Sequence, residues 1–163
     1  MAGSEKTGVD AARRDLFRGA AVVLTPEKRT PKAALAAVEK LWRDAGAKIV
    51  TMPAAVHDKV VSSTSHLQHA VAFALSSLIG EVNRRHPETK KLLAGSFRDM
   101  TRIAGSNARD WAVICSANSS ELKKSIDNMI KRLSGIKRGI SGSRKLEKIF
   151  LQGKIARQKL LNI

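Results

Sequence analysis

The sequence predicts a mainly α-helical protein in which a short β-α-β unit precedes an all-helical region. Two short β-branched runs, 20–24 and 48–52, flank a segment with helical spacing, which is typical of β-α-β. From Ala54 onward, apolar residues recur at steps of three and four, the period of an amphipathic helix. The chain has 163 residues, of which 43% are hydrophobic, so it is long and apolar enough for about one domain with a buried core.

The β-α-β unit is expected in the first third of the chain. Strand 20–24 is closed by Thr25-Pro26, and the helix that follows begins at Pro31 and ends near Ala45-Gly46. The length of this crossover predicts that strand 48–52 lies parallel to the first strand. Because two strands do not form a stable sheet unaided, part of the sheet is missing from this unit.

The helical region is predicted to hold one long helix and several shorter ones. The long helix covers 54–85 and ends at His86-Pro87. Shorter helices are expected at 88–93, 97–104, 108–118, 120–133 and 144–161. Ser120 is expected to cap the fourth of these, and glycines interrupt the chain after it.

Positive charge is concentrated near the carboxyl end. The net charge is +16, and residues 121–163 hold 12 Lys+Arg against 3 Asp+Glu. Such a segment is either a solvated basic tail or a contact surface for a polyanion such as nucleic acid or phospholipid. No zinc-finger spacing and no aromatic RNA-binding motif accompanies it.

Several classes of protein are excluded by composition. The single Cys115 does not allow an intramolecular disulfide or a cysteine-based zinc site. The run 60–80 is too polar for a membrane span, and 1–15 lacks the apolar core of a signal peptide. We therefore expect a cytoplasmic protein without membrane contact.

Two groups of polar residues are candidates for chemistry. His66 and His69 lie three residues apart on the long helix, and Ser65 shares a face with His69. They are helix-interface histidines, part of a substrate pocket, or a metal pair that lacks a third ligand. Asp99 and Arg102 form either an exposed ion pair or, with Arg102 alone, a clamp for a carboxylate. Since GxGxxG, GxxxxGK[ST] and GxSxG are all absent, the motifs alone do not describe a self-contained enzyme.

Four stretches together carry a family resemblance. They are Met-Ala-Gly-Ser-Glu-Lys-Thr-Gly-Val (1–9), Ser-His-Leu-Gln-His-Ala-Val-Ala-Phe-Ala-Leu (65–75), Gly-Ser-Phe-Arg-Asp-Met-Thr-Arg-Ile-Ala (95–104), and Trp111 with the Asn118 region. Their order and spacing resemble the prephenate/arogenate dehydrogenase family of tyrosine biosynthesis over about residues 1–133. The resemblance implies three parts: the end of a Rossmann domain (1–52), a helical dimerisation and substrate domain (53–134), and a basic tail (135–163).

The resemblance also implies roles for single residues. Arg102 matches the arginine that binds the substrate carboxylate, and His69 and Ser65 match positions in the substrate pocket. Ser4 and Glu5 match the loop after the family's catalytic histidine. Trp111 matches an aromatic residue of the pocket or the dimer contact, with simple core packing as the alternative. Gln68 stands where the family has proline, so the helix is expected to run unbroken there.

The implied reaction is oxidative decarboxylation of prephenate (or arogenate) to 4-hydroxyphenylpyruvate (or its amino counterpart), with NAD or NADP as cofactor, in a homodimer. In the family, a His-Pro pair just before Met-Ala-Gly-Ser-Glu supplies the general base. This sequence starts at that methionine and also lacks the glycine-rich loop, so the isolated chain is expected to be an inactive fragment, a misassigned start or a gene remnant. Two alternatives stay open: a non-catalytic module whose basic tail binds nucleic acid, and a degenerate paralogue that keeps its pocket for regulation.

Overall fold

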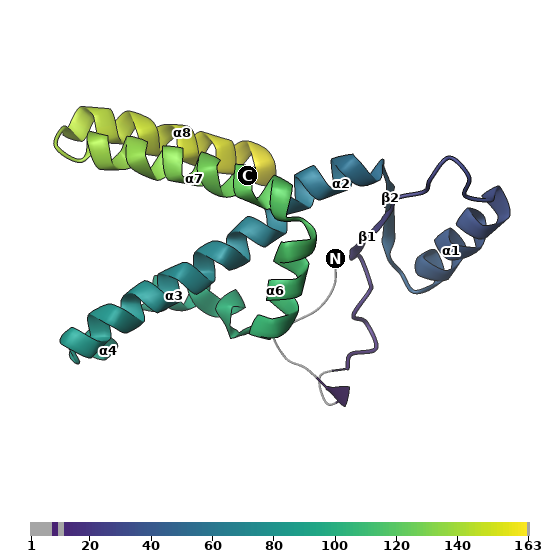
Figure 1. Cartoon of the computed structure of the whole chain (residues 1–163), viewed down its shortest axis with the longest axis horizontal. Helices are drawn as coiled ribbons and strands as arrows, with labels where there is room; N and C mark the ends of the chain where they lie inside the picture. The colour runs from purple at the N-terminus through teal and green to yellow at the C-terminus, as the bar shows by residue number, and fades with distance from the viewer. Residues whose placement is uncertain (1–7, 10–11, 163) are drawn as a thin grey trace. The chain divides into compact units, whose positions relative to one another are not determined.

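The computed structural model describes residues 8–9 and 12–162 and divides into two compact units, Met1–Leu122 and Lys123–Ile163 (Figure 1). The first holds a small parallel sheet and most of the helices, and the second is a helical hairpin, so the predicted fold class is confirmed. Within the described part of the chain, no helix is both long and apolar enough to cross a membrane.

The β-α-β unit forms as the sequence predicts. Strands β1 (Ala21–Leu24) and β2 (Lys48–Thr51) pair in parallel, with Ala21 opposite Lys48. Helix α1 (Lys32–Asp44) starts after Pro31 and ends before Gly46, whose φ of +82° suits a residue without a side chain. Phe17 packs edge-on against Trp42 of α1 at 5.0 Å between ring centroids, which fastens the segment before β1 to the helix.

The predicted long helix is continuous in extent but not uniform. It consists of α2 (Ala54–Val61), a π-helical segment η2 (Ser62–His66) and α3 (Leu67–Arg85), which ends at His86 as expected. The backbone N–H of Leu67 donates to the carbonyl of Ser62, five residues earlier. The expectation of an unbroken α-helix around Gln68 therefore needs correction, because a π-turn directly precedes it. The Ser62 and Thr64 hydroxyls donate to the carbonyls of Lys59 and Val60, and such side-chain bonds compete with the regular helical ladder.

Short helices complete the first unit. After α4 (Thr89–Leu92) come α5 (Gly95–Thr101) and a 3₁₀ turn η3 (Arg102–Gly105), so Gly95 begins a helix where a helix starting at residue 97 was expected. Helix α6 (Ala108–Ala117) is capped by Asn107, whose side-chain oxygen accepts from the N–H groups of Arg109 and Asp110. Both α5 and η3 pack against α3. Among the described residues, the buried apolar side chains are Val61, Ala72 and Leu122.

The second unit is a hairpin of two long helices. Helix α7 (Ser119–Gly139) begins one residue before the predicted cap Ser120 and continues past Leu133, where its end was expected. A glycine inside a helix costs only about 1 kcal/mol, so Gly135 does not stop it. At Gly139 the chain turns, and a Cβ there would lie 3.3 Å from Cδ1 of Ile149 in α8 (Ser143–Leu161). Helix α8 begins one residue before the final helix expected at 144–161 and ends where expected, so this prediction is confirmed.

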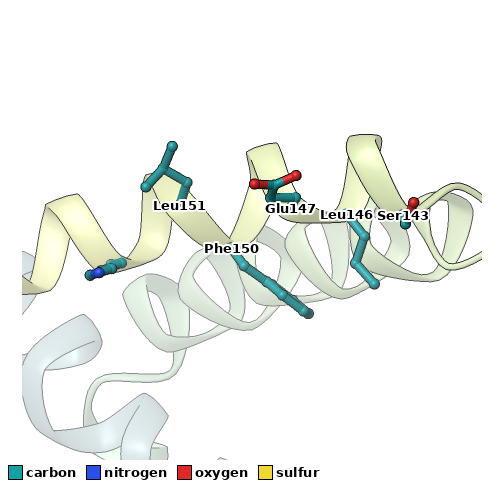
Figure 2. A pocket seen from close by; sticks show the side chains of 6 residues that line it. Ser143, Leu146, Glu147, Phe150 and Leu151 are labelled. Atoms are coloured by element: carbon teal, nitrogen blue, oxygen red, sulfur yellow. The ribbon is translucent and has the colours of Figure 1, made fainter.

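Helix α8 keeps much of its apolar surface exposed. A mostly apolar depression of about 550 Å³ runs along it, lined by Ser143, Leu146, Glu147, Phe150, Leu151 and Lys154. Figure 2 shows that Leu146 and Phe150 project to one side of the helix and Glu147 and Leu151 to the other. Phe150 is 55% exposed and Leu151 is 51% exposed.

Candidate functional site

Two aromatic side chains far apart in the sequence meet in the first unit. The imidazole of His69 on α3 stacks on the indole of Trp111 on α6, with centroids 3.3 Å apart and planes inclined by 16°. His66 meets the same indole edge-on at 6.2 Å. Trp111 therefore contacts both histidines that the sequence singles out. They lie on successive turns of the long helix formed by α2, η2 and α3.

Asn118, the C-cap residue of α6, forms further contacts between α6 and this long helix. Its amide nitrogen Nδ2 donates to the backbone carbonyl of Asp58 at 2.8 Å and lies 3.4 Å from Nδ1 of His66. Trp111, Cys115 and Asn118 are spaced by four and three residues, so they share one face of α6. We call Ser65, His66, His69, Trp111 and Asn118 the histidine–tryptophan site.

Ser65 is linked to His69 through its backbone. Nδ1 of His69 donates to the Ser65 carbonyl at 3.1 Å, one helical turn away. The contact runs through the backbone of Ser65, and the shared face of the two side chains stays a prediction. Both residues are half-buried, as are His66 and Trp111.

Burial shifts two ionisable groups near the site. Desolvation lowers the pKa of His66 below its usual range, and the nearby His57 and His69 lower it further, while Asp58 opposes the shift. His57 itself contacts Asp58, with Nδ1 2.9 Å from Oδ1. Desolvation also raises the pKa of the Cys115 thiol, which makes this thiol a poor nucleophile.

A small pocket adjoins the stacked rings. Its volume is about 260 Å³ and it is lined by His69, Ala70, Phe73, Ala108, Trp111, Ala112 and Cys115. The lining is apolar except for the imidazole and the thiol. Such a pocket suits a ring-shaped apolar body whose polar groups are fixed at its margin.

The other predicted site residues lie elsewhere. Arg102 is exposed and begins η3, the turn that packs against α3, the helix of His69. Ser4 and Glu5 lie outside the described residues. The structure thus brings Ser65, His69 and Trp111 together.

Sequence reasoning missed the bond from Asn118 to Asp58 and the pocket residues Phe73 and Cys115. The helical spacing between Trp111 and Asn118 is the sequence feature that could have indicated a contact of Asn118 with the long helix.

Two features of the described residues bear on metal and dinucleotide binding. No three His, Cys, Asp or Glu side chains there are grouped as metal ligands. The loop between β1 and α1, residues 25–31, contains no glycine, and Pro31 at its end has no N–H to donate. This loop therefore lacks the glycines that let a backbone approach a pyrophosphate closely.

Comparison with known proteins places this geometry in a family. Residues 53–152 match "Prephenate dehydrogenase, dimerization domain" and residues 1–51 match "Prephenate dehydrogenase, nucleotide-binding domain". The chain is 36% identical over 142 residues to a cyclohexadienyl dehydrogenase of Zymomonas mobilis, covering 86% of this chain and 48% of that protein. It is also 36% identical over 137 residues to a prephenate dehydrogenase of Bacillus subtilis, covering 84% and 37%.

A solved structure agrees with the sequence matches. The crystal structure of prephenate dehydrogenase from Aquifex aeolicus, in complex with hydroxyphenyl propionate and NAD⁺, aligns with a TM-score of 0.84 and 33% identity. The alignment covers 97% of this chain and 56% of that one. The chain spans about half the length of the relatives it matches. Within that span, sequence and fold agree throughout, and the chain belongs to the prephenate dehydrogenase family.

Proposed function

We propose that this chain is the substrate-binding and dimerisation part of a prephenate or arogenate dehydrogenase. The proposed reaction is the oxidative decarboxylation of prephenate to 4-hydroxyphenylpyruvate in tyrosine biosynthesis. The observation that supports it most is the stack of His69 on Trp111 beside a pocket of about 260 Å³. The resemblance assigns these two residues to the substrate site, and they lie 42 positions apart in the sequence, so only folding brings them into contact.

Each proposed role follows from side-chain chemistry. Arg102 binds a substrate carboxylate, because a guanidinium donates two parallel hydrogen bonds to it. His69 and Ser65 line the pocket, and Trp111 covers the substrate ring. Ser4 and Glu5 match the family's loop after the catalytic histidine, and we propose that they contribute to substrate binding. When bound, NAD⁺ or NADP⁺ supplies the hydride acceptor.

We further propose that the isolated chain binds substrate without converting it. The family's His-Pro pair and glycine-rich loop are not among these 163 residues. Proton and hydride transfer need those groups, whereas binding needs the arginine and the pocket. Mixing the purified chain with prephenate and NAD⁺ or NADP⁺ should therefore produce no reduced nicotinamide.

Ligand binding tests the substrate site directly. We expect hydroxyphenyl propionate and prephenate to quench Trp111 fluorescence in a Trp42→Phe background. Arg102→Gln should weaken binding roughly 10- to 100-fold, the usual range for a lost charge-assisted hydrogen bond. Arg98→Gln, which removes another exposed arginine from neighbouring α5, is the matched control and should bind as the parent does. Equal affinity of the two variants would contradict the role of Arg102.

The same region supports a proposed homodimer. The match over residues 53–152 carries the description "dimerization domain" and includes the exposed Phe150 and Leu151. With Leu146 they line the mostly apolar depression on α8, and a contiguous apolar surface is typical of a site that a partner covers. We propose a division into a nucleotide-binding part (1–52), a dimerisation and substrate part (53–134) and a basic segment (135–163).

A second candidate function rests on charge. Residues 123–163 hold 12 Lys+Arg and 2 Asp+Glu, and they form the helices of the hairpin. Contact with nucleic acid or another polyanion would use this surface. Such binding should weaken steeply as salt rises and disappear when 135–163 are deleted. Absence of duplex binding at low salt would remove this candidate.

A further inference from the structure

The two histidines of the site make different contacts through the same ring atom. Nδ1 of His69 lies 3.1 Å from a backbone carbonyl, that of Ser65. Nδ1 of His66 lies 3.4 Å from a side-chain amide nitrogen, that of Asn118. One neighbour is an acceptor and the other is a donor, so the protons on the two neutral rings must sit differently.

For His69 the partner decides the position of the proton. A carbonyl oxygen only accepts, so Nδ1 of His69 must carry hydrogen. In the neutral ring this leaves Nε2 with a lone pair. His69 therefore offers an acceptor at Nε2.

For His66 the orientation of Asn118 is decisive. The carbonyl of Asp58 also only accepts, so the amide nitrogen of Asn118, and not its oxygen, must face it at 2.8 Å. The same nitrogen lies 3.4 Å from Nδ1 of His66 and has a second hydrogen to donate. Since an amide nitrogen cannot accept, Nδ1 of His66 holds the lone pair and Nε2 carries the hydrogen.

We propose that Asn118 is a positioning residue that holds His66 as the Nε2–H tautomer, opposite to the Nδ1–H tautomer of its neighbour His69. The pair then offers a hydrogen-bond donor and a hydrogen-bond acceptor at its two Nε2 atoms. Asn118 touches no ligand in this assignment and acts on the site through His66 and through the position of α6. Its hydrogen bond to Asp58 links positions 60 residues apart and holds the end of α6 against α2. In this position Trp111 of α6 contacts both histidine rings.

The charged surroundings favour a neutral His66. A proton on Nδ1 would point at the N–H of Asn118, which is repulsive. On the long helix formed by α2, η2 and α3, His57 and His69 disfavour a positive charge at His66, whereas Asp58 favours it. From α6, the contacting side chains are Trp111 and Asn118, which are uncharged.

The consequence for a ligand rests on the proposed function. A group that reaches Nε2 of His66 must accept a hydrogen bond, as a carboxylate does, and a group that reaches Nε2 of His69 must donate one, as a hydroxyl does. Prephenate carries both kinds of group. The tautomers themselves do not depend on that substrate.

The test is a long-range ¹H–¹⁵N spectrum of the histidine rings in the full ¹⁵N-labelled chain at a pH where the rings are neutral. In the unmodified protein we expect a pyridine-like Nδ1 and a pyrrole-like Nε2 for His66, and the reverse for His69. Assignment uses His66→Gln and His69→Gln. A pyrrole-like Nδ1 at His66 would overturn the proposal, whether or not prephenate binds.

Variants of Asn118 test its part in the assignment. In Asn118→Asp the carboxylate accepts, so His66 should change to Nδ1–H or become protonated, while His69 stays unchanged. Asn107→Asp adds the same charge at the other end of α6, where aspartate is an equally good cap, and should leave both rings as they were. An unchanged His66 in folded Asn118→Asp would show that Asn118 does not set the tautomer. If that variant does not fold, Asn118→Ala replaces it and should leave His66 as a mixture of tautomers, whereas a pure Nε2–H form would overturn the role of Asn118.

Discussion

The histidine–tryptophan site and the α7–α8 hairpin (residues 123–161) are held by different kinds of contact. In the site, ring stacking and an asparagine side chain join residues that lie more than 40 positions apart in sequence. In the hairpin, two successive helices approach each other where Gly139 meets Leu146 and Ile149. The first arrangement is polar, directional and long-range, and the second is apolar and local.

This difference matters for what each region can do. Directional contacts fix the distance and orientation of side chains, which a binding site requires. Apolar contacts are non-directional, and those of the hairpin leave Phe150 and Leu151 exposed on α8. All five residues of the histidine–tryptophan site belong to the first unit, whereas the hairpin keeps exposed apolar side chains on α8.

The largest expected effect comes from truncating an aromatic ring in each region. Trp111→Ala should lower the free energy of unfolding by about 2 kcal/mol, because it removes a half-buried indole and two ring contacts. Phe150→Ala, measured by urea denaturation at low protein concentration, should change it by less than about 0.5 kcal/mol. Equal losses would mean that the hairpin is as tightly packed as the site.

Self-association should depend on the apolar face of α8. Phe150→Lys should shift sedimentation from dimer toward monomer, because a charge would have to be buried in the proposed interface. Gln152→Lys adds the same charge to an exposed position two residues along the helix and should leave the dimer intact. A monomeric parent chain at micromolar concentration would contradict the proposed dimer.

Two glycines of α7 separate helix propensity from packing. A Cβ at Gly135 would meet no atom within 4 Å, so Gly135→Ala should raise the free energy of unfolding by about 1 kcal/mol. At Gly139 a Cβ would lie 3.3 Å from Ile149, which would have to move, so Gly139→Ala should bring little or no gain. A gain at Gly139 as large as that at Gly135 would show that the two helices pack loosely at the turn.

The smallest expected effect is a pH dependence that belongs to the site alone. The pKa of His66 is lower in the folded chain than the ordinary value of 6.5, so the unfolded chain binds this proton first as the pH falls. The contribution of His66 is complete above pH 6.5 and is lost as the pH falls toward the folded pKa. In urea titrations at several pH values, His66→Gln should flatten this slope, and an unchanged slope would contradict the lowered pKa of His66.

Much of the fold follows from local sequence signals. Pro31 and Gly46 bound α1, and Pro87 ends α3 after His86, because these residues act on their own backbone whatever surrounds them. The boundaries of α7 differ from the predicted ones at Ser120 and Gly135, because the packing of a whole helix contributes more free energy than one serine cap or one interior glycine. The π-turn at Ser62–His66 was also not predicted, because helical periodicity does not report one extra residue in a turn.

The candidate site was predicted only in part. Helical spacing places Ser65 and His69 on one face, and the family resemblance selects Trp111 and Arg102. The contacts of Asn118 at the end of α6 could not be predicted from local sequence, because its partners Asp58 and His66 lie 60 and 52 residues away from it.

The sequence by itself therefore determined the order of the elements, the parallel β-α-β unit, the basic carboxyl end and the family. The tertiary structure decided which polar atoms meet: the stack of His69 on Trp111, the two bonds of Asn118 and the opposite surroundings of the two histidines. The physical reason is the distance along the sequence over which each kind of interaction acts. Backbone propensities act over a few residues, whereas a hydrogen bond between distant segments exists only after packing has set their separation and angle.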